Sequence, residues 1–180
     1  MRDCLTPDYM FASYKEVTPE FLRSIGVRAL LVDIDNTLAP YEEPDPSPEH
    51  HAWLAALSAA GICVALVSNN HRERVERFNR TLRLLAYADS KKPHRKTLLL
   101  AMKTLGVSLS ETAMLGDQLL TDAYAGKHIG LSAIIVPPIR DKRNLFFRFK
   151  RRCERPFIRK YAKRNGYREW MAFWRVRPTR

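Results

Sequence analysis

Short apolar runs alternate with amphipathic segments along the chain, and this pattern sets the expected architecture. The apolar runs lie at 29–32, 62–67, 86–88, 113–115 and 132–136. Runs that are apolar at consecutive positions and this short are typical of strands buried on both faces. Because strand and helix candidates alternate, we expect an α/β protein with a Rossmann-like, mostly parallel sheet covered by helices on both faces.

Caps and breakers mark the ends of the predicted helices. Thr18-Pro19 and Ser47-Pro48 each place a capping residue before a proline at the first helical position, and Gly26 and Gly61 close the two segments. The predicted helices are 18–26, 47–61, 72–80, 94–105 and one that ends near 128. A glycine also follows the last two of these helices, as expected of helix C-termini.

Charge divides the chain into two parts. Its 180 residues have a formal net charge of +12. Residues 1–139 hold 15 Lys and Arg against 16 Asp and Glu, and residues 140–180 hold 16 against 3, so the excess lies entirely in the second part. This length suits one domain with an appendage. We predict a folded core over 1–139 and a basic, aromatic-rich helical tail over 140–180.

The three cysteines, Cys4, Cys63 and Cys153, have no C-x-x-C spacing and are expected to be reduced. The N-terminal residues lack the apolar region of a signal peptide, and no stretch approaches the roughly 18 apolar residues of a spanning helix. We therefore expect a cytoplasmic protein that is not integral to a membrane.

Polar residues that suit phosphoryl chemistry follow four of the predicted strands. In chain order they are Asp33 and Asp35, Ser68 and Asn69, Lys92, and Asp117 with Asp122. The carboxyl ends of parallel strands lie at one edge of a sheet, so these side chains are expected to converge on one pocket. Carboxylates suit Mg²⁺, hydroxyl and amide groups suit phosphate oxygens, and a lysine offsets developing negative charge.

Each cluster also has a purely structural interpretation. Residues 33–37 and 68–70 could be polar turns and helix caps, and Lys91 and Lys92 could be a solvated pair. Because four such clusters occur in order, each at the end of an apolar strand, we favour the catalytic interpretation.

The four motifs resemble those of the haloacid dehalogenase-like (HAD) phosphatases. They are Asp33-Ile34-Asp35-Asn36-Thr37, Ser68, Lys92, and Gly116-Asp117 with Asp122. Lysine directly precedes proline in the family pattern, which favours Lys92 over Lys91. The resemblance implies a Mg²⁺-dependent phosphomonoesterase that works through an aspartyl-phosphate.

The family pattern also implies a role for each motif residue. Asp33 is the implied nucleophile, and Asp35 is the implied general acid and base. Mg²⁺ would be held by Asp33, Asp117 and the backbone carbonyl of Asp35, with Asp122 supporting that shell. Ser68, Asn69 and Lys92 would contact the phosphoryl oxygens.

A closer resemblance is to the YqeG-like branch of HAD subfamily IIIA, whose relatives include the mitochondrial-type phosphatidylglycerophosphate phosphatases. Six stretches within about residues 5–139 carry it: 5–8, 17–20, 33–38, 68–70, 92–93 and 116–122. The last heptapeptide, Gly-Asp-Gln-Leu-Leu-Thr-Asp, is the most specific. This resemblance implies a lipid head-group phosphate, such as that of phosphatidylglycerophosphate, as substrate.

The intervals between the motifs leave room for one helix and its loops, but not for the cap module that many HAD enzymes insert. We therefore expect no large cap domain and an open pocket, which suits a phosphate on a large molecule or on a surface. Two alternatives remain: a small sugar or nucleotide phosphatase, and a nucleic-acid or ribosome-associated protein that uses the basic tail. An intact Asp35 argues against a protein that only binds.

The basic tail is expected to bind the anionic surface of a membrane. Arginines form one helical stripe, Leu145, Phe149 and Cys153 form another, and Pro156 is expected to interrupt the helix. The arginines are Arg148, Arg151, Arg152 and Arg155, and the expected aromatic and apolar anchors beyond Pro156 are Phe157, Ile158, Tyr161, Tyr167, Trp170, Phe173 and Trp174. Packing of the tail on the core, and binding of nucleic-acid phosphates, are the alternatives.

Overall fold

A parallel sheet forms the centre of the molecule. The computed structural model describes residues 3–140 and 145–165. Within these residues the sheet has six strands in the order β1-β6-β5-β2-β3-β4, all paired in parallel. The strands are β1 (Tyr9–Met10), β2 (Ala29–Val32), β3 (Cys63–Val67), β4 (Leu85–Tyr87), β5 (Thr112–Gly116) and β6 (Ser132–Ile135). The predicted α/β class is confirmed. Among the described strands, the short edge strand β1 is the one that the apolar runs did not predict.

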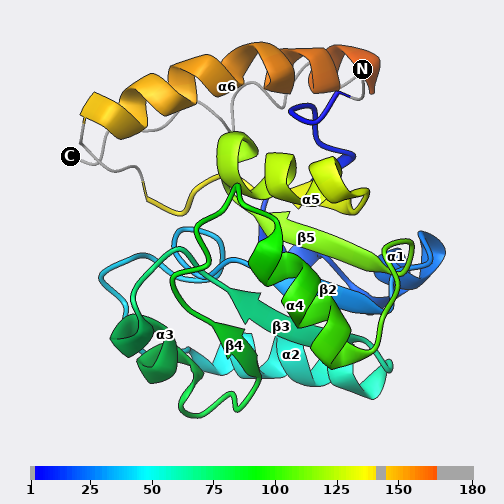
Figure 1. Cartoon of the computed structure of the whole chain (residues 1–180), viewed down its shortest axis with the longest axis vertical. Coiled ribbons are helices and arrows are strands. Elements are labelled where there is room, and N and C mark those ends of the chain that lie inside the picture. Colours follow the sequence, from blue (N-terminus) through cyan, green and yellow to red (C-terminus); the bar gives the residue numbers. More distant parts are fainter. Residues whose placement is uncertain (1–2, 141–144, 166–180) are drawn as a thin grey trace.

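Helices cover both faces of the sheet, as Figure 1 shows. They are η1 (Tyr14–Glu16), α1 (Pro19–Ser24), α2 (Pro48–Ala59), α3 (Arg72–Asn79), α4 (Lys96–Leu105), the π-helical turn η2 (Leu119–Ala123), α5 (Tyr124–Ile129) and α6 (Leu145–Arg164). Alternate strand residues decide which helix packs where. Leu30 and Leu66 face a core shared with α1, α2 and α3, whereas Leu31 and Met114 face a core shared with α4 and α5.

The long helix α6 packs on the sheet edge formed by β1 and β6, and Figure 1 shows it at the top of the molecule, above α5. Ile158 and Tyr161 are buried there with Met10, Ala133 and Ile135. The Tyr161 hydroxyl accepts the backbone N–H of Met10 at 3.1 Å, so α6 also satisfies a donor of the edge strand. Helix α6 is therefore docked on the core through Ile158 and Tyr161.

This docking corrects two expectations about the tail. Pro156 does not interrupt α6, although an interior proline costs about 3 kcal/mol. Each buried large apolar side chain contributes about 1.5–3 kcal/mol, and Ile158 and Tyr161 supply that burial just after the proline. These two residues are also not free to anchor the chain in a membrane, because they contact the sheet.

Other expectations fall outside the described residues. Tyr167, Trp170, Phe173 and Trp174 lie there, and so does the side chain of Arg148. Over residues 3–140 and 145–165, no helix has the length and apolar character needed to cross a bilayer.

His50 ties the start of α2 to the loop that follows β2. Its Nδ1 accepts the backbone N–H of Ser47 at 2.8 Å, so the ring proton lies on Nε2, which donates to the carbonyl of Leu38 at 2.8 Å. The ring also stacks on Tyr14 with centroids 5.2 Å apart. Burial lowers the pKa of His50 below its usual value, because a charged ring would be desolvated at this position.

We expect this histidine to make stability depend on pH. The unfolded chain binds a proton on His50 at a higher pH than the folded chain does, so stability is lost as the pH falls below about 6.5. Chemical denaturation at several pH values should show a flatter loss of unfolding free energy in His50→Gln than in wild type. His51→Gln, at the neighbouring exposed position, should keep the wild-type slope. Equal slopes in wild type and His50→Gln would contradict this assignment.

Candidate active site

The predicted polar residues converge at the carboxyl ends of β2, β3, β4 and β5. Since β2 lies between β3 and β5, Asp33 emerges at the middle of this edge, with Ser68 on one side and Asp117 on the other. A pocket of about 240 Å³ opens there. It is lined by Asp33, Asp35, Asn36, Tyr41, Ser68, Asn69, Asn70, Lys92, Gln118, Thr121, Asp122 and Lys150.

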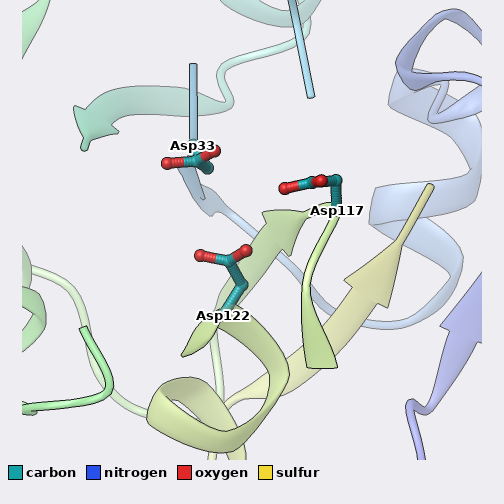
Figure 2. A group of neighbouring side chains, drawn as sticks. All are labelled: Asp33, Asp117 and Asp122. Atoms are coloured by element: carbon teal, nitrogen blue, oxygen red, sulfur yellow. The ribbon is translucent and has the colours of Figure 1, made fainter. Parts of the chain in front are cut away.

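Three buried carboxylates form the acidic part of the site. Asp33, Asp117 and Asp122 each offer an oxygen within 4.8 Å of the others, and Figure 2 shows their carboxylates gathered around a common space. Burial raises the pKa of Asp33 to about 8 and that of Asp117 to about 6, and in both cases the neighbouring carboxylates add to the rise. Such a cluster favours a bound cation, which would stabilise the charged form of Asp33 and Asp117.

Lys92 supplies one positive charge to this cluster. Its Nζ lies 2.7 Å from Asp33 Oδ1, 2.7 Å from Asp122 Oδ1 and 2.7 Å from the carbonyl of Val67. Burial alone would lower the pKa of the lysine, but the two carboxylates outweigh it and raise that pKa, so Lys92 stays protonated. Lys91 is exposed, and the pocket therefore receives the lysine that the proline-based argument favoured.

The site fits a hard divalent cation. All three donors are carboxylates, which suit Mg²⁺. Asp117 Oδ1 is buried and has no hydrogen-bond partner among the residues that the structure describes, whereas a buried oxygen is normally satisfied. A cation beside Asp33 and Asp117 would satisfy it.

Asp35 stands apart from the triad. Its Oδ2 accepts the side-chain amide of Asn70 at 2.8 Å, and its Oδ1 accepts Nε of Arg74 at 3.3 Å. Arg74 also donates to the carbonyl of Pro44 at 3.0 Å, and its guanidinium lies 5.1 Å from the ring centroid of Phe78. The side chain of Asp35 is thereby directed away from the cation site, which leaves only its backbone carbonyl as the ligand that the resemblance implies.

Asn70 and Arg74 were not assigned a role from the sequence. They occur four residues apart, and the N-terminal half of α3 carries Arg74 toward the pocket side. Arg74 is one of five arginines between residues 71 and 83, so the sequence does not distinguish it from its neighbours.

Ser68 and Asn69 follow β3 and line the pocket, but they make different contacts. Ser68 Oγ accepts the backbone N–H of Asn70 at 3.0 Å and lines the pocket. Asn69 uses both ends of its amide on the neighbouring loop: its Nδ2 donates to the carbonyl of Lys92 at 2.9 Å, and its Oδ1 accepts the backbone N–H of Lys92 and the hydroxyl of Ser90. Asn69 thus holds the lysine loop against the end of β3.

One turn of α6 completes the acidic side of the site. Arg151 donates to both the carboxylate Oδ2 and the backbone carbonyl of Asp117, the latter at 2.6 Å. It also pairs with Glu154, which is fully buried. The sequence pattern predicts that Arg151 belongs to a membrane-binding stripe of arginines. For Arg151 that prediction is wrong, because its guanidinium contacts Asp117 in the site.

Comparisons with known proteins agree with this geometry. The model of the haloacid dehalogenase-like hydrolase family matches residues 8–130. A Bacillus subtilis (strain 168) protein named "Probable phosphatase YqeG" is 31% identical over 164 residues, which cover 91% of this chain and 95% of that protein. An uncharacterized protein of known structure from Listeria monocytogenes serotype 4b shares the fold, with a TM-score of 0.52, 16% identity, and coverage of 66% of this chain and 85% of that one.

Gly116 allows the close approach of Asp122. A Cβ atom at this position would lie 2.4 Å from both Cβ and Cγ of Asp122. The glycine before Asp117 is therefore required by packing at the site, independently of any backbone strain.

We expect Gly116→Ala to lower the free energy of unfolding by about 1–3 kcal/mol, the usual cost of overpacking. Thermal and denaturant unfolding measure this. Combining it with Asp122→Gly in a double-mutant cycle identifies the clash, because the cost of the added methyl group should largely disappear when the Asp122 side chain is absent. An unchanged unfolding midpoint in Gly116→Ala would refute the packing argument.

Proposed function

The chain belongs to the haloacid dehalogenase-like hydrolases and is a phosphatase of that type, and on this basis we propose a Mg²⁺-dependent phosphomonoesterase that forms an aspartyl-phosphate on Asp33 and acts on a lipid head-group phosphate. One observation carries the proposal. A buried aspartate at the central strand end is flanked by two further carboxylates and a lysine, while a second aspartate two residues later is held apart from them.

Asp33 is the proposed nucleophile. One of its oxygens attacks phosphorus as the ester P–O bond breaks, and the leaving alkoxide takes a proton from Asp35. Asp35 then takes a proton from water, whose oxygen attacks phosphorus and breaks the bond to Asp33, releasing inorganic phosphate. Asn70 and Arg74 hold the carboxyl group of Asp35 in place for both proton transfers.

The other groups stabilise charge. Asp33, Asp117 and Asp122 would hold Mg²⁺, which supplies electrostatic stabilisation of the phosphoryl oxygens when bound. Lys92 adds a positive charge 2.7 Å from Asp33 and lowers the cost of bringing a phosphate dianion to a carboxylate nucleophile. Ser68 offers its hydroxyl to a phosphoryl oxygen, and Asn69 serves by fixing the loop that carries Lys92.

The mouth of the pocket supports a lipid substrate. Tyr41 and Lys150 line the pocket, and Phe149, beside Lys150 in sequence, is 65% exposed. Ile139 is also exposed, and its backbone N–H donates to the carbonyl of Asn36, another lining residue. Apolar and aromatic side chains next to cations suit a membrane interface, where the rings enter the headgroup region and the cations meet lipid phosphates.

The exposed basic residues of α6 extend this surface, and we propose that residues 140–180 bind anionic lipid on the cytoplasmic side. Arg152 and Arg155 are exposed, unlike Arg151. Each basic residue near an anionic surface contributes about 1 kcal/mol, so a few of them suffice for reversible attachment.

Conservative variants should separate the two aspartates of the first motif. With p-nitrophenyl phosphate and Mg²⁺, Asp33→Asn should abolish phosphate release, because an amide does not attack phosphorus. Asp35→Asn should slow turnover by about 10²- to 10⁴-fold and accumulate phosphoenzyme, detected by intact-protein mass, because no base activates water.

Asp45→Asn is the matched control, since Asp45 is exposed on a loop and pairs with Arg77 and Arg80, and it should retain wild-type turnover. The covalent mechanism fails if Asp33→Asn stays within about tenfold of wild type, a barrier change of only about 1.4 kcal/mol.

The substrate proposal is tested with the full chain on vesicles that contain phosphatidylglycerophosphate, and in parallel on soluble sugar phosphates and nucleoside monophosphates. We expect kcat/KM to be at least about tenfold higher on the lipid, that is, about 1.4 kcal/mol or more of preferential transition-state binding.

Activity should vanish with a chelator and return with Mg²⁺ but poorly with Ca²⁺, whose longer bonds and higher coordination would misplace the nucleophile.

A higher kcat/KM on a soluble sugar phosphate would overturn the lipid assignment, and full activity in the chelator would overturn the metal site. Tight, salt-dependent RNA binding without hydrolysis of any phosphomonoester would favour a nucleic-acid binding function.

A further inference from the structure

A single turn of α6 contacts the aspartate that follows β5. Arg151 donates to Oδ2 and to the backbone carbonyl of Asp117, so one guanidinium grips the side chain and the main chain of the same residue. Its side chain is 14% exposed and that of Asp117 is fully buried. The remaining carboxylate oxygen, Oδ1, is buried and has no hydrogen-bond partner among the described residues.

Glu154 fixes the other side of this contact. Its Oε2 accepts from Arg151 at 2.9 Å, and its Oε1 accepts the backbone N–H groups of Leu119 and Leu120 at 2.8 and 3.2 Å. These two donors belong to the first residues of η2, which have no partners within the helical turn itself. Arg151 and Glu154, three residues apart on α6, thus hold both ends of the segment 117–120.

We propose that Arg151 is a positioning residue of the metal centre, held in place by Glu154, and that it fixes Asp117 with Oδ1 directed at the cation. The proposal rests on the proposed function only in taking Asp117 as a metal ligand. An arginine that met the carboxylate end-on would occupy both oxygens. Here the two terminal nitrogens of the Arg151 guanidinium contact Oδ2 and the backbone carbonyl of Asp117. This leaves Oδ1 for the cation and restricts rotation of the Asp117 side chain.

The direction in which metal affinity changes when Arg151 is removed distinguishes a positioning role from a role in charge balance. If Arg151 only neutralised Asp117 and Glu154, its loss would leave more negative charge beside the cation and strengthen metal binding. If Arg151 orients Asp117, its loss weakens binding, since partners that orient metal ligands are worth about 10- to 100-fold in affinity.

The test is Mn²⁺ binding to the purified full chain, followed by calorimetry and by the electron paramagnetic resonance signal of free Mn²⁺, without any substrate. We expect Arg151→Gln to weaken Mn²⁺ binding by about 10- to 100-fold. Arg151→Lys keeps the charge but not the planar fork, so it should fold and bind with an affinity between those of wild type and Arg151→Gln. Arg28→Gln removes the same charge from an exposed position just before β2, at the opposite edge of the sheet, and should bind as wild type does.

The measured Mn²⁺ affinities decide whether Arg151 positions Asp117. Binding by a folded Arg151→Gln as tight as or tighter than wild type overturns the positioning role and leaves the proposed function standing. If Arg151→Gln does not fold, as judged by thermal unfolding, Arg151→Lys decides by the same criterion. A wild-type chain that binds no Mn²⁺ overturns the metal centre and this inference together.

Discussion

The structure depends on the balance of charge in a buried cluster of carboxylates. Asp33, Asp117, Asp122 and Glu154 are all buried at one edge of the sheet, and such groups are stable in the interior only when cations or donors face them. Lys92 and Arg151 supply two positive charges from opposite sides, one from the loop after β4 and the other from α6. The raised pKa values of Asp33 and Asp117 indicate that these two charges do not complete the balance, and a divalent cation would.

Much of this arrangement could be predicted from the sequence, because it follows from local pattern. A buried parallel strand needs a continuous apolar run, and a motif at its end needs only the next few residues, so five strands and the convergence of Asp33, Ser68, Lys92 and Asp117 could be inferred. Long-range contacts could not. β1 is two residues long and Arg74 reaches Asp35 across 39 residues, and neither leaves a local signal. Arg151 reaches Asp117 across 34 residues, and no local pattern identifies Asp117 as its partner.

The basic tail illustrates how composition can mislead. A net charge of +13 over residues 140–180 indicates a surface that seeks anions, and the exposed Arg152 and Arg155 fit that interpretation. Two residues of the same stretch point inward instead of toward solvent. Glu154, one of only three acidic residues there, is fully buried, and Arg151 is nearly so. An isolated acid within a basic helix, three positions from an arginine, was the available hint that one face of α6 turns inward.

The bond between Met10 and Tyr161 has a consequence for the order in which the fold can form. Its two residues are 151 positions apart, and β1 pairs with β6 across a similar distance in sequence. During synthesis on a ribosome, all four motifs emerge before α6 exists, and the N-terminal strand has nothing to pair with until β6 follows. Closing so long a loop is entropically costly and slow. In the nascent chain β1 therefore cannot pair until β6 has emerged, and the contacts of α6 with Met10 and Asp117 can form only after that.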